Sequence, residues 1–197
     1  MAGINFKTNG DTTPRGKQKI WIAMHPSDYS SAEFDSIVKS VLNKHGNCAV
    51  YFEDFSHKNK RENLSAIKQS QIFILIVSKK TLTTPNDAID VQFKFAIENN
   101  IPVLPIVVER NLEKLFAKKC GSIQYLDQCS EDSTAISYDE KFSKFLSSVL
   151  LGDYEIKEIN NAFDAMIFLS YRKKDREYAQ ELMRLFHKND LFRDVAI

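Results

Sequence analysis

The chain has 197 residues, with 27 lysines and arginines against 26 aspartates and glutamates, and this near-balance argues against nucleic-acid binding, which needs a basic surface. Its 43% hydrophobic and 27% charged residues are typical of a globular protein with a buried core and exclude a disordered chain. No apolar run approaches the roughly 18 residues that span a bilayer, and the N-terminus has no signal-peptide pattern, so we expect a cytoplasmic protein that binds no membrane.

Residues 1–18 are polar and carry three of the six glycines, so we expect a flexible leader there. From residue 19 to residue 151, short apolar runs alternate with amphipathic stretches, which is typical of a parallel sheet covered on both faces. The pattern predicts an α/β, flavodoxin-like fold with a five-stranded parallel sheet and helices on both faces. The expected strands are Ile20–Met24, Ala49–Phe52, Ile72–Val77, Val103–Val108 and Ile123–Leu126.

The expected helices are marked by apolar stripes and by capping residues. Residues 34–42 and 142–150 each carry apolar side chains at helical spacing, so each run has one face for a core. Serine, threonine or asparagine side chains can satisfy the first backbone N–H groups of a helix. The expected helix starts are Ser30 with Glu33, Asn59 with Glu62, Thr84 before Pro85, Leu112, and Ser137 with Glu140.

The C-terminal residues repeat the beginning of the predicted domain. Residues 167–175 align without gaps with residues 20–28, and each segment is followed by an amphipathic stretch. We therefore expect a linker at 152–162 and an incomplete second βα repeat at 163–197. A fragment of that length buries too little surface to fold alone, so the sequence is expected to stop inside a second domain of the same fold.

The second copy carries a recognisable box. Residues 163–172 read Phe-Asp-Ala-Met-Ile-Phe-Leu-Ser-Tyr-Arg. This segment resembles the opening box of Toll/interleukin receptor (TIR) domains, and the residues that carry the resemblance are Phe163, Asp164, Ser170, Tyr171, Arg172 and Asp175. Residues 19–151 resemble the family less closely, with Ala-Met-His at positions 23–25 in place of Ser-Tyr-Arg. The resemblance implies a degenerate TIR domain at 19–151 and the start of a second one at 163–197.

TIR domains of one kind associate with other TIR domains in signalling, and those of another kind cleave NAD at the nicotinamide–ribose bond. In the enzymes, a glutamate lies nine residues before the position that matches Ile101, and this count reaches Gln92. Bond cleavage develops positive charge on the ribose, which a carboxylate stabilises and a carboxamide does not. Loss of such a group commonly costs a factor of about 10² to 10⁴ in rate, so we expect this copy to be inactive or nearly so.

Three other carboxylates are candidates for the same cleft. Asp87, Glu53 and Asp54 lie near the carboxyl ends of expected strands, where ligands bind in doubly wound folds. Asp87 also suits the first turn of a helix, and the other two suit a solvated strand end. The basic segment 55–61 fits either a phosphate contact or a solvated loop.

Neither a metal site nor a required cofactor is expected. The four histidines have no ligand spacing, and the cysteines at 48, 120 and 129 have no CxxC pattern and are expected to be ordinary thiols. No phosphate-cradling glycine motif occurs.

Three functions remain open. The first is an inactive TIR module that assembles with or regulates other TIR domains, including the second copy. The second is NAD cleavage by the complete protein, with a glutamate supplied beyond Ile197, in a bacterial defence role by family analogy. The third is a receptor in which the first domain binds a nucleotide without cleaving it.

Overall fold

The computed structural model describes residues 3–10, 13–129, 137–150 and 176–188. The chain divides into two compact units, Met1–Leu150 and Leu151–Ile197. In the second unit, the described residues form one helix, α8 (Arg176–Lys188), where the repeat predicts an amphipathic helix. The expected linker at 152–162 and the box residues between Phe163 and Asp175 lie outside the described residues.

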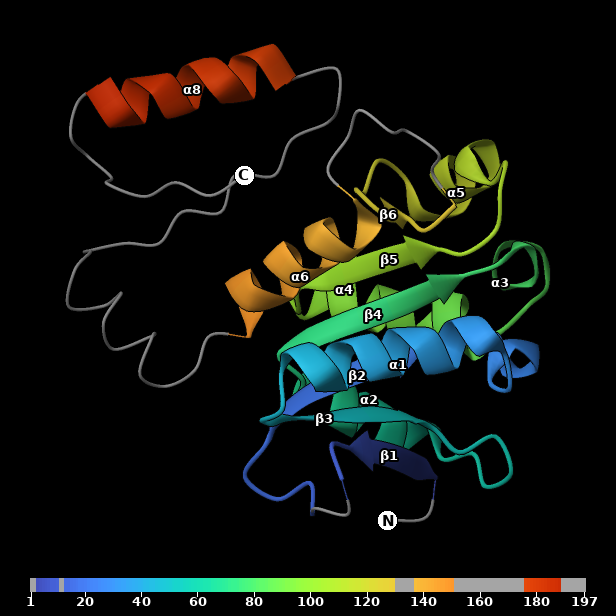
Figure 1. Cartoon of the computed structure of the whole chain (residues 1–197). Helices are drawn as coiled ribbons and strands as arrows, with labels where there is room; N and C mark the ends of the chain where they lie inside the picture. The colour runs from blue at the N-terminus through green and yellow to red at the C-terminus, as the bar shows by residue number, and fades with distance from the viewer. Residues whose placement is uncertain (1–2, 11–12, 130–136, 151–175, 189–197) are drawn as a thin grey trace. The chain divides into compact units, whose positions relative to one another are not determined.

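The first unit is built on a six-stranded, mostly parallel sheet (Figure 1). The strands are β1 (Ile4–Thr8), β2 (Gln18–Ala23), β3 (Cys48–Glu53), β4 (Ile72–Val77), β5 (Val103–Val107) and β6 (Leu126–Asp127). Their spatial order is β1-β3-β2-β4-β5-β6, and the pairs from β3 to β6 are all parallel. Without β1 this is the flavodoxin-like order, 2-1-3-4-5, that the sequence predicts.

The predicted flexible leader is wrong over Ile4–Thr8. These residues form β1, which pairs antiparallel with β3 in the register Ile4↔Glu53 to Thr8↔Ala49, so the sheet has six strands and not five. Two contacts hold these residues in a regular strand. Ile4 packs against the core on one face, and Lys7 on the other face bonds to Asp35 at 2.9 Å. With only two apolar residues, the strand is too short for its alternation to stand out in the sequence.

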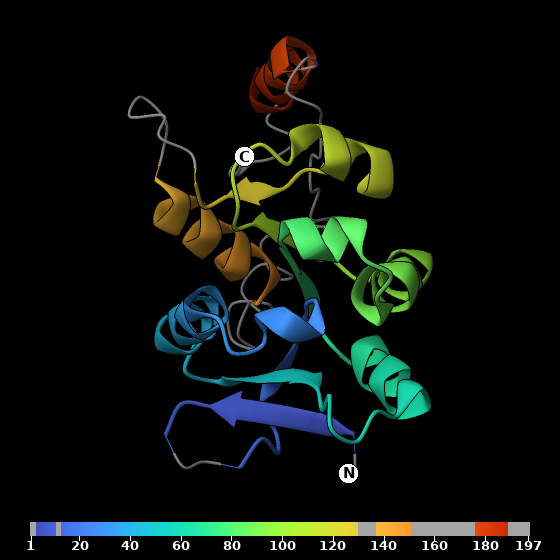
Figure 2. The ribbon, with the colours of Figure 1, turned by 90° about the vertical axis from the view of Figure 1, so that its right-hand side faces the viewer.

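Helices cover both faces of the sheet (Figure 2). On one face, α1 (Ala32–Lys44) and α6 (Tyr138–Val149) enclose a core with β2, β4 and β5. On the other face lie α2 (Lys60–Lys68), α3 (Lys79–Thr83), η2 (Ala88–Phe93), α4 (Lys94–Glu98) and α5 (Glu113–Cys120). All six residues of β4 are buried, which confirms the prediction of a central strand.

Of the five predicted helix starts, two are wrong and three are confirmed, including Leu112, which directly precedes α5. Asn59 and Ser137 accept hydrogen bonds from the third residue of α2 and of α6, as expected. The cap of α1 is Ser31 and not Ser30, because the hydroxyl of Ser31 accepts from the backbone of Phe34. Thr84 ends α3, and the next helix, η2, is a π-helix that begins at Ala88.

The three cysteines are free thiols with different exposure. Cys48 and Cys120 are buried, and burial raises the pKa of each thiol to about 11. Cys129 is half-buried, and burial also raises its pKa. Because thiolate is the reactive form, we expect the native chain at neutral pH to expose at most one fast-reacting thiol to an aromatic disulfide reagent and all three after denaturation. If all three thiols of the native chain reacted rapidly with the reagent, Cys48 and Cys120 would not be buried as described.

Candidate functional site

The candidate site lies where neighbouring strands reach the carboxyl edge of the sheet. Asp28 follows β2, Glu53 ends β3, and Ser78 follows β4. The hydroxyl of Ser78 donates to Asp28 Oδ2 at 2.6 Å and lies 3.1 Å from the hydroxyl of Thr81. The turns after two adjacent strands are therefore tied together at the edge where doubly wound folds bind ligands.

Gln92 lies beside this edge, and both polar atoms of its amide are hydrogen-bonded inside the protein. It belongs to η2, and its side chain is 3% exposed. Its Oε1 accepts a hydrogen bond from the indole nitrogen of Trp21 at 3.0 Å, and its Nε2 donates to Glu53 Oε2 at 3.1 Å. The position thus needs one acceptor and one donor, which a carboxamide supplies and a carboxylate does not.

Glu53 is the one predicted cleft carboxylate that meets Gln92 directly. It is 6% exposed at the end of β3. Burial raises the pKa of its carboxyl group, and the nearby negative charge of Asp87 raises it further. Lys58 and the hydrogen bonds from Gln92 and Asn63 act in the opposite direction, but burial dominates. Glu53 is therefore a shielded carboxyl group with a weakened tendency to ionise.

The other two predicted carboxylates have different places. Asp87 precedes η2 and is close enough to affect Glu53 electrostatically. Asp54 belongs to the turn after β3, where the backbone N–H of Ser56 bonds to its Oδ1 at 2.9 Å and lowers its pKa, and His57 lies 3.2 Å from its other oxygen. The structure therefore joins Glu53 to Gln92 by a hydrogen bond, whereas Asp87 acts on Glu53 only through its charge and Asp54 stabilises its own turn.

The buried cluster around Glu53 and Gln92 also contains Trp21 and Asn63, which were not predicted as site residues. Trp21 is fully buried, as its strand position predicts, but its bond to Gln92 could not be read from the sequence. Asn63 in α2 is 1% exposed, and its Oδ1 has no hydrogen-bond partner among the described residues. A tryptophan in a central strand needs a partner for its indole N–H, and this need is the signal that could have pointed to a polar residue facing it.

The arrangement provides one buried carboxyl group and neutral amides. No cluster of histidine, cysteine or acidic residues in the described parts of the chain could hold a metal ion. None of the helices in those parts is long and apolar enough to cross a membrane. The buried cluster can therefore hold strand β3 against β2, α2 and η2, and any chemistry there would depend on Glu53.

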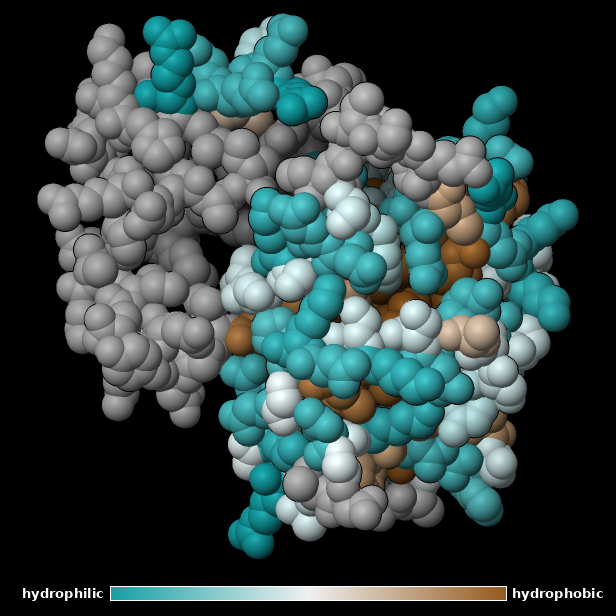
Figure 3. All heavy atoms as spheres, in the orientation of Figure 1, coloured by the Kyte–Doolittle hydropathy of each residue, from teal (hydrophilic) through white to brown (hydrophobic). Residues whose placement is uncertain are grey.

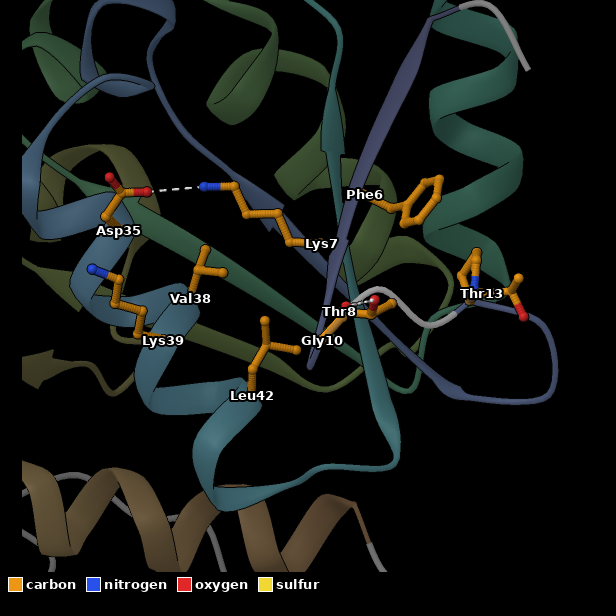
Figure 4. Close-up of a pocket in the computed structure, with 10 residues that line it drawn as sticks. Phe6, Lys7, Thr8, Gly10, Thr13, Asp35, Val38, Lys39 and Leu42 are labelled. Carbon is orange, nitrogen blue, oxygen red and sulfur yellow. Dashed lines mark hydrogen bonds and ion pairs between the residues drawn. The ribbon is translucent and has the colours of Figure 1, made fainter.

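A shallow hollow lies elsewhere on the domain (Figure 4). It has a volume of about 570 Å³ and lies between β1 and α1. Its lining includes Thr8, whose partner in β3 is Ala49, close to the start of that strand. Because Glu53 is at the opposite end of β3, the hollow does not coincide with the candidate site.

Comparisons with known proteins give no family assignment. No protein-family model matches the sequence, and no curated protein matches it. Among solved structures, the flavodoxin-like domain of a Synechococcus sp. protein is similar at 13% identity and a TM-score of 0.41, over 70% of this chain and 99% of that chain. The fold assignment rests on the strand order described above.

Proposed function

We propose that residues 19–151 form a TIR-like interaction module that does not cleave NAD and that assembles with or regulates other TIR domains. The observation that carries the proposal is the placement of Gln92. Its two polar atoms are committed to Trp21 and Glu53, and its side chain is 3% exposed. A side chain that is bonded and buried in this way stabilises the fold and is shielded from a ligand.

The chemistry of NAD cleavage supports the same proposal. Breaking the bond between nicotinamide and ribose develops positive charge on the sugar, which a nearby carboxylate stabilises. The amide of Gln92 carries no charge. The resemblance to NAD-cleaving TIR domains therefore fails at the residue on which their chemistry depends.

Glu53 favours a second candidate function, NAD binding or cleavage by this domain. Its carboxyl group has a raised pKa and lies at the carboxyl edge of the sheet. Such a group resembles the general acids of glycoside-cleaving sites. Against this, only 6% of Glu53 is exposed, and one carboxylate oxygen already accepts from Gln92.

An NAD hydrolysis assay on the full chain separates the two functions. We expect no nicotinamide release above the buffer rate from the unmodified chain or from Gln92→Ala. The matched pair Glu53→Gln and Asp54→Asn removes one buried and one turn-forming carboxylate. Turnover that disappears in Glu53→Gln and persists in Asp54→Asn would refute the inactive module and establish Glu53 as the reacting group.

NAD cleavage by a second TIR copy would be compatible with this proposal. The box residues from Phe163 to Asp175 support a second TIR copy, for which this first copy would be a partner. In that arrangement NAD is a substrate of the second copy and not of residues 19–151. A longer form of the chain that releases nicotinamide while Glu53→Gln has no effect on the rate would support this division of roles.

A further inference from the structure

The face of the molecule drawn in Figure 3 gives no strong indication of a docking site, because hydrophobic residues occur there in small separate areas among hydrophilic ones. The interior contains a more informative feature. Asn63 of α2 is 1% exposed, and its Oδ1 has no hydrogen-bond partner among the described residues. Because a buried acceptor without a donor is unfavourable, this atom directs attention to the groups around it that could donate.

Glu53 is the neighbouring group that can supply the donor. The amide of Asn63 already hydrogen-bonds to the Glu53 carboxyl group, so the two side chains are within reach of each other. An ionised carboxylate only accepts hydrogen bonds, whereas a protonated one has an O–H that can donate. With Glu53 neutral, the amide of Asn63 can turn its Oδ1 toward this O–H, while Glu53 Oε2 still accepts from Gln92 Nε2. The neutral acid therefore satisfies an acceptor that the carboxylate leaves unpaired.

The surroundings of Glu53 also favour its neutral form. The side chain is 6% exposed, and this burial, together with the negative charge of Asp87, raises the pKa of its carboxyl group. Lys58, in the loop after β3, lowers the pKa, but burial has the larger effect. The cluster residues on α2, η2 and β2 carry no charge; they are Asn63, Gln92 and Trp21.

Helix α2 is held to the domain by few buried side chains. Of its nine residues, only Asn63 and Ile67 are buried. Leu64 and Ala66 are partly buried against the same core. The helix packs on β3 and η2, and Asn63 joins it to the buried carboxyl group. Elements with few buried apolar contacts open at a low cost in free energy, so a change at Asn63 affects α2 first.

We propose that Glu53 is a proton-dependent latch: its neutral carboxyl group holds α2 against β3 and η2, and loss of the proton to solvent loosens α2. The basic segment 55–61 connects β3 to α2, so the latch also sets how firmly this segment is held. The inference concerns how the fold is held together, and it is independent of whether the domain cleaves NAD.

Hydrogen exchange of backbone amides tests the latch on the full chain. The folded chain binds the extra proton between the unfolded pKa of about 4.3 and the raised folded value. The protection of α2, corrected for the intrinsic effect of pH on exchange, should therefore fall roughly tenfold per pH unit over that interval and then level off. Helix α6, on the opposite face of the sheet, is the internal control and should keep its protection. An equal loss in α6 would overturn the latch, because the whole domain would then depend on the proton.

Two variants separate Glu53 from its neighbour in the sequence. Glu53→Gln keeps an acceptor for Gln92 and a donor for Asn63, so α2 should stay protected at high pH and lose its pH dependence. Asp54→Asn removes a carboxylate of the adjacent turn and should leave the pH dependence of α2 unchanged. A pH dependence that persists in Glu53→Gln, or that disappears in Asp54→Asn, would overturn the proposal.

A carbon NMR titration of the unmodified chain gives a second measurement, which needs no variant to fold. The carboxyl carbon of Glu53 should titrate with a midpoint above the ordinary value of about 4.3. The side-chain amide signals of Asn63 should shift with the same midpoint. A midpoint at or below the ordinary value, or Asn63 signals that do not follow the titration, would show that this proton does not control the contact between β3 and α2.

Discussion

Gln92→Glu should lower the free energy of unfolding by about 3 kcal/mol at neutral pH, by comparison with other unpaired charges in protein interiors. Nε2 of Gln92 donates to Glu53 Oε2 at 3.1 Å, so the substitution replaces a hydrogen bond with two adjacent carboxyl groups. Both residues are almost fully buried, and little water is available to screen the repulsion. The introduced glutamate would therefore destabilise the domain without reaching a substrate.

The loss should depend on pH in a defined direction. The pKa of Glu53 is already raised by burial, and a neighbouring carboxylate raises the pKa of the pair further. The folded variant then binds more protons than the unfolded chain, so its stability falls as pH rises through the unfolded value of about 4.3 toward the raised folded value. Urea unfolding at pH 7 and near pH 4 should show a large deficit at pH 7 that shrinks on acidification.

A swapped variant provides the matched control. Gln92→Glu combined with Glu53→Gln restores one carboxylate and one amide, with the carboxylate now accepting from Trp21. We expect the double variant to recover most of the lost stability and to lose the steep pH dependence. A Gln92→Glu variant as stable as the unmodified chain at pH 7 would mean that the side chain leaves the core and is free for a ligand, which would contradict the proposed function.

The sequence was most informative where one physical signal dominated. Six consecutive apolar residues in β4 predicted a central strand, and the βα alternation predicted the order of five strands. The sequence did not predict β1, because a strand with only two apolar residues gives too short a pattern. The formation of β1 depends on long-range contacts such as the bond of Lys7 to Asp35. Local sequence cannot contain such a contact.

The sequence named Gln92 and Glu53 as residues of interest but could not show how their side chains are oriented. Counting back from Ile101 reached Gln92 as the position of the family glutamate, but a count does not say which way the side chain points. In the π-helix η2, the buried residues are Ala88, Ile89, Gln92 and Phe93. Ile97, four residues after Phe93, would lie on the same face of a continuous α-helix, but it is 43% exposed. A sequence read with the spacing of an α-helix cannot show this change of face.

Trp21→Phe should cost about 2 kcal/mol, because it removes the indole N–H that Gln92 Oε1 accepts and leaves a small cavity. Trp21 is fully buried, so no water replaces the lost donor. Ile22→Val, on the opposite face of β2, has no polar partner and should cost less, about 1 kcal/mol. Chemical denaturation followed by far-ultraviolet circular dichroism measures both variants, since Trp21 is the only tryptophan.

The double variant Trp21→Phe with Gln92→Met shows whether the bond to the indole matters beyond packing. Methionine has no acceptor that requires the lost donor, so the two losses should not add, and the coupling between them should be at least about 0.5 kcal/mol. Additive losses would mean that Trp21 contributes only its volume. In that case Gln92 would be held by Glu53 alone, and its amide oxygen could turn toward a ligand at the carboxyl edge. The proposal of an inactive module would then lose the contact on which it depends.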